Sequence, residues 1–358
     1  MKYDSPEYRQ WKSRQNKKNL KRRTKQKNGK KRSKTKIVEY NHTVKKKYKY
    51  DKSTRSFNFK CPKVFSFLRN PIETTEFFNS ILKFVTNTKN AKKSLFIDLS
   101  SISDLTIDAL MYLLAIVNNL NKKFDNNTKF SGNIPYNPDV QKLFNESGFF
   151  NFVAHKSELE VTASNKIQIA TGVKCNNMLV KRIIDFVCEK SSIKPRNISF
   201  LYNMIMELMS NTNKHAYNEE QMLEPCWYLF VNYEEKDEIV SFSFMDTGEG
   251  IPATVKKTIF EKLGKTLQSK KYNLEYRYVV STLNGEMRTA TNLKYRGKGL
   301  PKIREICSNN QIQNMRIITN KADVLVETND YKAHDIKEAL KGTLYYWQID
   351  IKELKGVL

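Results

Sequence analysis

Apolar residues recur with helical spacing in the first half of the chain. Within 74–85 they fall three and four positions apart, which places them on one face of a helix. Similar patterns predict helices over 104–121 and 138–146. Two short apolar stretches, 94–99 and 129–134, have the length and flanks of buried strands. Because these strands alternate with the helices, we expect a parallel or mixed sheet connected by crossover helices.

The second half of the chain also contains segments with helical spacing and segments with the alternation of strands. Residues 198–217 predict one helix whose apolar face is Leu201, Ile205, Leu208 and Met209. Residues 240–245 alternate as a strand does, and 300–306 predict a further helix. The apolar run 344–349 lies near the end of the chain.

These patterns predict a two-domain α/β protein. We assign a basic arm to 1–52, a first domain to 53–155, a linker to 156–164 and a second domain to 165–358. Within the second domain, residues 253–294 are too many for a plain loop, so they predict a lid with helices of its own.

Positive charge is concentrated at the N-terminus. The 358 residues carry a formal net charge of +26, and residues 1–52 hold 21 Lys and Arg against four Asp and Glu. Such a segment buries too little apolar surface to order by itself. Its charge suits a nucleic-acid backbone, which binds through counterion release, with an acidic protein or a solvated tail as alternatives. DNA, RNA and acidic protein all stay open as targets.

Several classes of protein are disfavoured. The longest apolar run is too short for a membrane span, and no secretory signal is expected, so we predict a cytoplasmic protein without a membrane partner. The five cysteines are odd in number and unclustered, which argues against a zinc site and a disulfide framework. We expect reduced, mostly buried thiols.

Three polar segments carry candidate chemistry. Glu207 and Asn211 are four positions apart, so a helix presents both on one face. Asp246 ends a strand and precedes a turn containing Gly248 and Gly250. Before the helix at 300–306 stand Gly297, Lys298 and Gly299, where backbone N–H groups can meet phosphate. Each segment alone has an ordinary structural explanation, but together they predict a pocket for a nucleotide and its metal.

The order of these motifs resembles the GHKL ATPases, the family of gyrase, heat-shock chaperone, histidine kinase and MutL ATP-binding domains, over about residues 165–352. The resemblance implies a Bergerat α/β sandwich, a mixed sheet with helices on one face, that binds ATP and Mg²⁺. It implies that Asn211 holds Mg²⁺ and that Glu207 orients or deprotonates the attacking water. It also implies that Asp246 accepts a hydrogen bond from the adenine amino group, joined by Thr343.

The same resemblance assigns the glycines. Gly248 and Gly250 let the chain pass close to the base. The phosphate segment corresponds to Gly297, Lys298, Gly299 and Leu300. His215 lies one turn beyond Asn211 and is expected to be structural rather than a phosphoacceptor.

Residues 96–100, 105–114 and 139–150 resemble a STAS domain, the fold of anti-sigma-factor antagonists. The resemblance implies a protein partner for the first domain. It places Ile107 and Asp108 at the regulatory serine position, so the usual phosphoswitch is not expected. Asp108 is either a permanent phosphate mimic or an ordinary first-turn aspartate, and we favour the second.

We therefore expect an ATP-controlled regulatory switch in which nucleotide state is coupled to a partner or a nucleic acid. Hydrolysis is expected to be slow, because no domain that could complete the γ-phosphate site follows the ATPase segment. Two alternatives are an anti-sigma-factor-like protein serine kinase and a non-enzymatic nucleic-acid-binding scaffold. A bacterial regulatory or antiviral-defence role and a homodimer are compatible with this pattern.

Overall fold

The computed structural model describes eight stretches of the chain, and the fold is given for these alone. They are 48–51, 55–87, 93–123, 128–153, 164–214, 223–263, 274–286 and 299–357. Nearly all of the predicted basic arm and the predicted linker lie outside them, as do Gly297, Lys298 and His215. By contacts between Cα atoms, residues 47–358 form one compact unit.

A four-stranded sheet with mixed pairing occupies the N-terminal half. Its order is β1-β2-β4-β6, with β1 antiparallel to β2 and the other two pairs parallel. The bounds are Tyr48–Asp51 (β1), Ser56–Lys60 (β2), Lys93–Asp98 (β4) and Thr128–Gly132 (β6). A separate parallel pair joins β3 (Val64–Phe65) to β5 (Asp104–Leu105).

The predicted helices of this half are confirmed, with one change of boundary. They are α2 (Pro71–Asn87), α3 (Ile107–Lys123) and α4 (Pro138–Glu146), followed by the short η1 (Phe149–Asn151). The helix predicted over 104–121 starts later, because Asp104 and Leu105 pair with β3 as a strand. Asn137 caps α4 by accepting hydrogen bonds from the N–H groups of Asp139 and Val140.

The C-terminal half contains a five-stranded sheet of order β10-β11-β9-β8-β7. The bounds are Lys166–Gly172 (β7), Trp227–Glu234 (β8), Ile239–Asp246 (β9), Gln313–Val326 (β10) and Tyr331–Asp350 (β11). Every described pairing in this sheet is antiparallel, which differs from the mixed sheet expected here. Tight connections between β8 and β9 and between β10 and β11 favour antiparallel neighbours.

Helices of the C-terminal half include the predicted α6 and α9. The bounds are Asn177–Ser191 (α5), Pro195–Ile198 (η2), Ser199–Lys214 (α6), Ile251–Leu263 (α7), Glu275–Leu283 (α8), Gly299–Ser308 (α9) and Ile351–Val357 (α10). Helices α7 and α8 fall within or beside the segment predicted as a lid.

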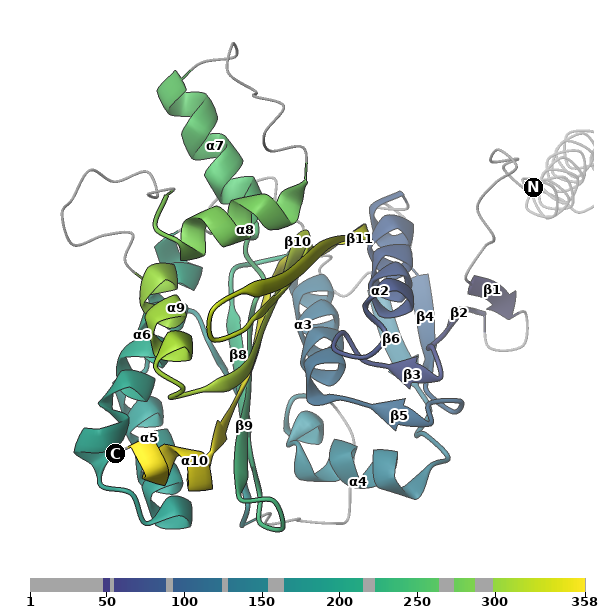
Figure 1. The fold of residues 1–358 in the computed structure, drawn as a ribbon. Helices are drawn as coiled ribbons and strands as arrows, with labels where there is room; N and C mark the ends of the chain where they lie inside the picture. Colours follow the sequence, from purple (N-terminus) through teal and green to yellow (C-terminus); the bar gives the residue numbers. More distant parts are fainter. Residues whose placement is uncertain are drawn as a thin grey trace, which may run out of the picture. The chain divides into compact units, whose positions relative to one another are not determined.

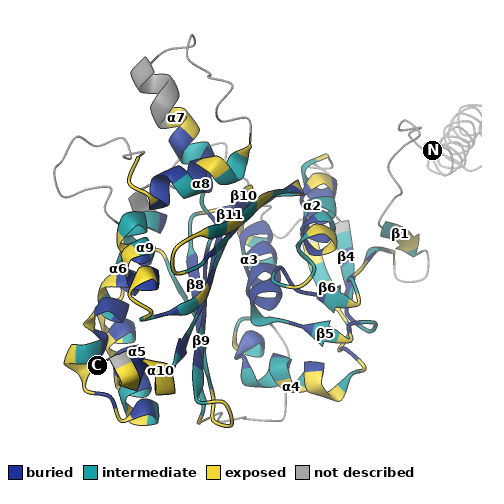
Figure 2. Cartoon of the chain, in the orientation of Figure 1, coloured by how far each residue is buried: buried dark blue, intermediate teal, exposed yellow. Residues whose placement is uncertain are grey.

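The five-stranded sheet is covered on both faces, although helices were expected on one face only. Figure 1 shows α5, α6 and α9 on one side of β8 and β9, with α2 and α3 on the other. Alternate residues of one strand accordingly enter two different cores: Phe244 packs with the first group of helices and Met245 with the second. Both faces of the sheet are buried along its middle (Figure 2). Helices of the N-terminal half therefore complete the core of the C-terminal half.

Within the described residues, the helices are too short or too polar to cross a membrane.

Candidate functional site

Glu207 and Gly299 lie against each other. Glu207 is on α6, which the buried side chains of Leu208 and Met209 fix in the core. Gly299 is the first residue of α9. A Cβ atom added to Gly299 would lie 2.6 Å from Oε1 and 2.8 Å from Cδ of Glu207. A side chain at 299 would displace the Glu207 side chain from this position, so the structure brings together two motifs that are far apart in the sequence.

Asn211 follows Glu207 by one turn of α6 and is half-buried. Residues four apart on a helix lie one above the other, so its amide is on the same side of α6 as the Glu207 carboxylate. The helix thus presents an acid and an amide in the spacing that the sequence predicted.

Asp246 is the last residue of β9 and lies between two neighbouring strands. It pairs with Thr343 on β11 and with Trp227 on β8. Side chains alternate between the faces of a strand, so Asp246 shares the face of Phe244, which packs in the α6 core. Its Oδ1 accepts a hydrogen bond from the Gly248 N–H at 2.8 Å. The carboxylate therefore faces the side of the sheet that α6 covers.

Burial raises the pKa of Asp246 to about 6. Hydrogen bonds from the Gly248 N–H and from Thr343 oppose that rise, because they stabilise the ionised form. A carboxyl with this pKa is mostly ionised at neutral pH and can accept a hydrogen bond from a ligand.

The phenol of Tyr345 is affected by the carboxylates of both Glu207 and Asp246. This residue of β11 is buried, and burial is the main cause that raises the pKa of its phenol. The charges of Asp246 and Glu207 both raise it further. Glu207 on α6 and Asp246 on β9 therefore act on the same side chain, and Gly299 joins them through Glu207.

The turn after Asp246 is fixed by two residues that sequence reasoning missed. Gly250 has φ +89°, and a Cβ atom there would lie 2.6 Å from Oδ1 of Asn320. Asn320 donates to the carbonyl of Glu249 at 2.9 Å and accepts from the Ala253 N–H at 3.2 Å. Thr319 accepts from the Ile251 N–H at 3.0 Å. Nothing in the local sequence of β10 indicated that it would meet this turn.

Thr343 lies beside this turn. Its hydroxyl is 3.1 Å from that of Thr319, and Thr319 also donates to the Gly342 carbonyl at 3.1 Å. Gly342 has φ +106°, and a Cβ atom there would collide with the carbonyl of Asp246. The pair Gly342 and Thr343 therefore holds the backbone at Asp246 closely.

The remaining predicted positions are partly described. Gly248 is close to Asp246, since an added Cβ would lie 2.9 Å from Oδ1. Leu300 is half-buried and packs against the core under α9. Gly297 and Lys298 lie outside the described residues, so their assignment to the phosphate segment stays a prediction.

An open hollow of about 400 Å³ lies at the end of β7 and the start of α5, next to Trp227, the β8 partner of Asp246. It is lined by residues 171–178 and by Trp227. Glu207, Asn211 and Asp246 are not among its lining residues. We therefore do not assign the predicted chemistry to this hollow.

In the described part of the chain, no group of three or more His, Cys, Asp or Glu side chains could hold a metal. Asn211 next to a single acid is a donor set for Mg²⁺, which keeps water ligands and takes phosphate oxygens. The five cysteines are all free; Cys61 and Cys307 are buried, Cys188 and Cys226 are half-buried and Cys175 is exposed, so fewer thiols are buried than expected.

Asp108, which was expected to be either a phosphate mimic or an ordinary first-turn aspartate, is fully buried. It accepts a hydrogen bond from the Phe67 N–H at 2.7 Å, and its other oxygen has no partner. Burial raises its pKa. A side chain in this position is not available to a partner protein, which disfavours the phosphate-mimic interpretation.

A scan against protein-family models finds no match to this chain, and a search of curated proteins finds none either.

Proposed function

We propose that this protein binds ATP with Mg²⁺ through its C-terminal half and hydrolyses it slowly, as a regulatory switch. One observation carries the proposal: Glu207 contacts Gly299 on the side of the five-stranded sheet that Asp246 faces. Residues 92 positions apart in the sequence, on α6 and at the start of α9, thus meet on the side of the sheet that Asp246 faces.

In this proposal each side chain has a role set by its position. Asp246 accepts a hydrogen bond from the adenine amino group, supported by Thr343. Glu207 orients the attacking water. Asn211 holds Mg²⁺ together with phosphate oxygens, and the metal neutralises charge on the phosphates.

In this proposal the glycines let the nucleotide approach the backbone closely. Gly248 and Gly250 form the turn that passes the base, and Asn320 keeps that turn in place. Gly299 opens α9, whose first N–H groups favour an anion. Gly297, Lys298 and Leu300 complete this phosphate segment in the proposal.

The N-terminal half connects nucleotide state to an output. Its fold is proposed to be STAS-like, with a protein partner, and residues 1–52 are proposed to contact nucleic acid. A cytoplasmic bacterial regulatory or defence protein, which could be a homodimer, fits this combination.

The decisive experiment measures ATP binding by calorimetry with Mg²⁺ present, on wild type and on Asp246→Ala and Asn211→Ala. We expect D246A to lose binding with and without metal, because adenine recognition does not need Mg²⁺. N211A should lose only the part of the affinity that depends on Mg²⁺. Wild type that binds ATP no better than D246A rules out the proposal.

A second experiment separates turnover from kinase activity. Incubation with ATP labelled on the γ-phosphate should release free phosphate slowly, and Glu207→Ala should abolish release while ATP binding persists. Label that appears on protein favours the serine-kinase alternative instead.

A further inference from the structure

Helix α3 of the N-terminal half contacts the two backbone segments that flank Asp246. Residue 246 pairs with Thr343 on one side and with Trp227 on the other. The residues just before these two partners are 341–342 on β11 and 224–226 ahead of β8. Tyr112 of α3 is bonded to the first segment, and Asn119 and Lys122 of α3 are bonded to the second.

Tyr112 holds the first segment. Its hydroxyl donates to the Lys341 carbonyl at 3.0 Å and accepts from the Lys341 N–H at 3.3 Å. Its ring is buried between Phe67 and Phe78, at centroid distances of 5.3 and 4.7 Å. The next residue, Gly342, is the one that approaches the Asp246 carbonyl. The buried ring of Tyr112 therefore fixes the position of the β11 backbone beside Asp246.

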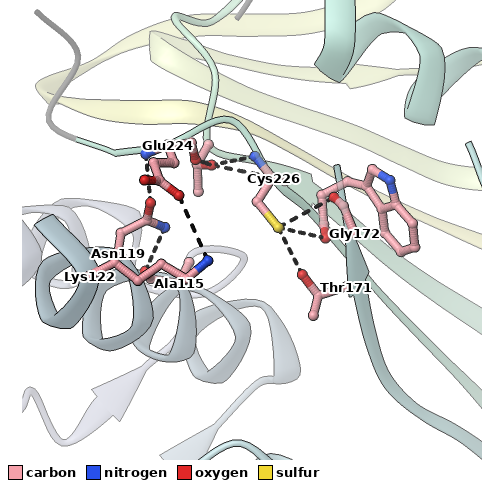
Figure 3. Close-up of polar contacts among 9 residues, drawn as sticks. Ala115, Asn119, Lys122, Thr171, Gly172, Glu224 and Cys226 are labelled. Carbon is pink, nitrogen blue, oxygen red and sulfur yellow. Dashed lines mark hydrogen bonds and ion pairs between the residues drawn. The ribbon is translucent and has the colours of Figure 1, made fainter. Parts of the chain in front are cut away.

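Asn119 holds the second segment. Its Oδ1 accepts a hydrogen bond from the Glu224 N–H at 2.6 Å, while its amide donates to the Ala115 carbonyl at 2.9 Å. Figure 3 shows Asn119 and Ala115 on the helix, facing Glu224 and Cys226. The bond to Ala115 fixes which amide atom faces Glu224. Asn119 is itself buried, and replacing it with alanine removes both of these bonds.

Thr247 carries this restraint to the site. It donates through its hydroxyl to the Glu224 carbonyl and accepts from the Cys226 N–H at 2.9 Å. Its own N–H donates to the Cys226 carbonyl at 3.0 Å. Thr247 stands directly between Asp246 and Gly248. Any shift of the segment 224–226 therefore displaces Thr247 and, with it, the adjacent Asp246, which is the proposed adenine contact.

We propose that Tyr112 and Asn119 are positioning residues for the nucleotide site, through which the N-terminal half sets nucleotide affinity. The proposal rests on the proposed function for its ligand. A partner that shifts α3 against the sheet would change the affinity for ATP. Because binding linkage is reciprocal, ATP would change the affinity for that partner by the same factor.

A matched control separates positioning from mere stabilisation. Thr74 on α2 is also buried, and its hydroxyl likewise donates to one carbonyl and accepts from one N–H, both of Ser66. Both bonds stay within the N-terminal half. Thr74→Val therefore removes the same number of hydrogen bonds as Tyr112→Phe without touching the five-stranded sheet.

The test compares Y112F, Asn119→Ala and T74V in the full chain by two measurements. The first is the Kd for ATP with Mg²⁺, which should rise at least about fivefold in Y112F and N119A and stay within about twofold in T74V. The second is amide hydrogen exchange without nucleotide, in peptides covering 246–250 and 341–343. Exchange there should be faster in Y112F and N119A than in T74V.

The outcomes distinguish the two proposals. Equal Kd values in all three variants overturn the inference, as does equal exchange. If wild type binds no ATP, the proposed function fails, and the exchange comparison still decides whether the two side chains position the Asp246 segment. Should Y112F not fold, N119A against T74V supports the same decision.

Discussion

Arg316 and Asp323, seven residues apart on β10, form a bidentate ion pair. Nε of the arginine is 2.8 Å from Oδ1 of the aspartate, and Nη2 is 2.6 Å from Oδ2. The Asp323 side chain is only 2% exposed. Arg316 also donates through Nη1 to the carbonyl of Leu68, so this pair connects β10 to the N-terminal half. The hydrogen bond with Asp323 raises the pKa of Arg316, which stays charged throughout.

Removing Asp323 should therefore destabilise the fold strongly. Asp323→Ala leaves the arginine partly buried without its counter-ion, which costs about 3 kcal/mol in the free energy of unfolding. Urea denaturation followed by circular dichroism measures this. The control is Glu305→Ala, which breaks the exposed Lys302–Glu305 pair and should cost no more than about 0.5 kcal/mol. Similar costs in the two variants would contradict the role given to the buried pair.

Gly299→Ala should damage both stability and the site. The new methyl group collides with Glu207, so we expect a loss of about 1–3 kcal/mol by urea unfolding. In a Glu207→Ala background the clash is gone, so the same substitution should cost at least about 1 kcal/mol less. Gly356→Ala on α10, where an added Cβ meets nothing within 4 Å, is the control and should be neutral or slightly stabilising. Additive costs at 207 and 299 would show that the two residues do not touch.

Asp246 should make stability depend on pH between about 4 and 6. Its pKa is about 6 when folded, against about 3.9 for an unperturbed aspartate. The folded state binds this proton more tightly, so the carboxyl favours folding at low pH and that contribution is lost as pH rises through 6. Asp246→Asn does not titrate. Relative to wild type, its stability should thus rise by about 1–3 kcal/mol from pH 4 to pH 7.

Unfolding in urea at several pH values tests this expectation. Thr343→Val is a second test. It removes a hydrogen bond that stabilises the ionised carboxyl of Asp246, so the pH at which the Asp246 contribution to stability is lost should rise. A stability difference between D246N and wild type that does not vary with pH would refute the assignment.

Asn320→Gly should loosen the turn after Asp246. Asn320 has a positive φ of 49°, which glycine also adopts, so the substitution removes the side-chain hydrogen bonds without adding backbone strain. We expect a loss of about 1–3 kcal/mol in unfolding free energy and weaker ATP binding. Asn310→Gly is the control, since Asn310 is exposed and has φ 53°. An ATP affinity equal in both variants would argue against a role for Asn320 at the site.

Local sequence patterns were sufficient to predict most of the individual elements and the chemistry that could be placed on them. Helical spacing located α2, α4 and α6, since burying one face of a helix leaves a period that can be read directly. The spacing of Glu207 and Asn211 put both on one side of α6 for the same reason. The alternation before Asp246 fixed the end of β9. These inferences depend on neighbours within about one turn of helix or one length of strand.

Which elements meet depended on how the whole chain folds. The contacts of Asn320 with the glycine turn, of Tyr112 with Lys341 and of Glu207 with Gly299 join residues that are 71, 229 and 92 positions apart. The antiparallel order of the five strands and the covering of their second face by α2 and α3 depend on strand pairing and on burial of both faces. Such pairings arise from the total apolar area removed from water, which no local pattern records.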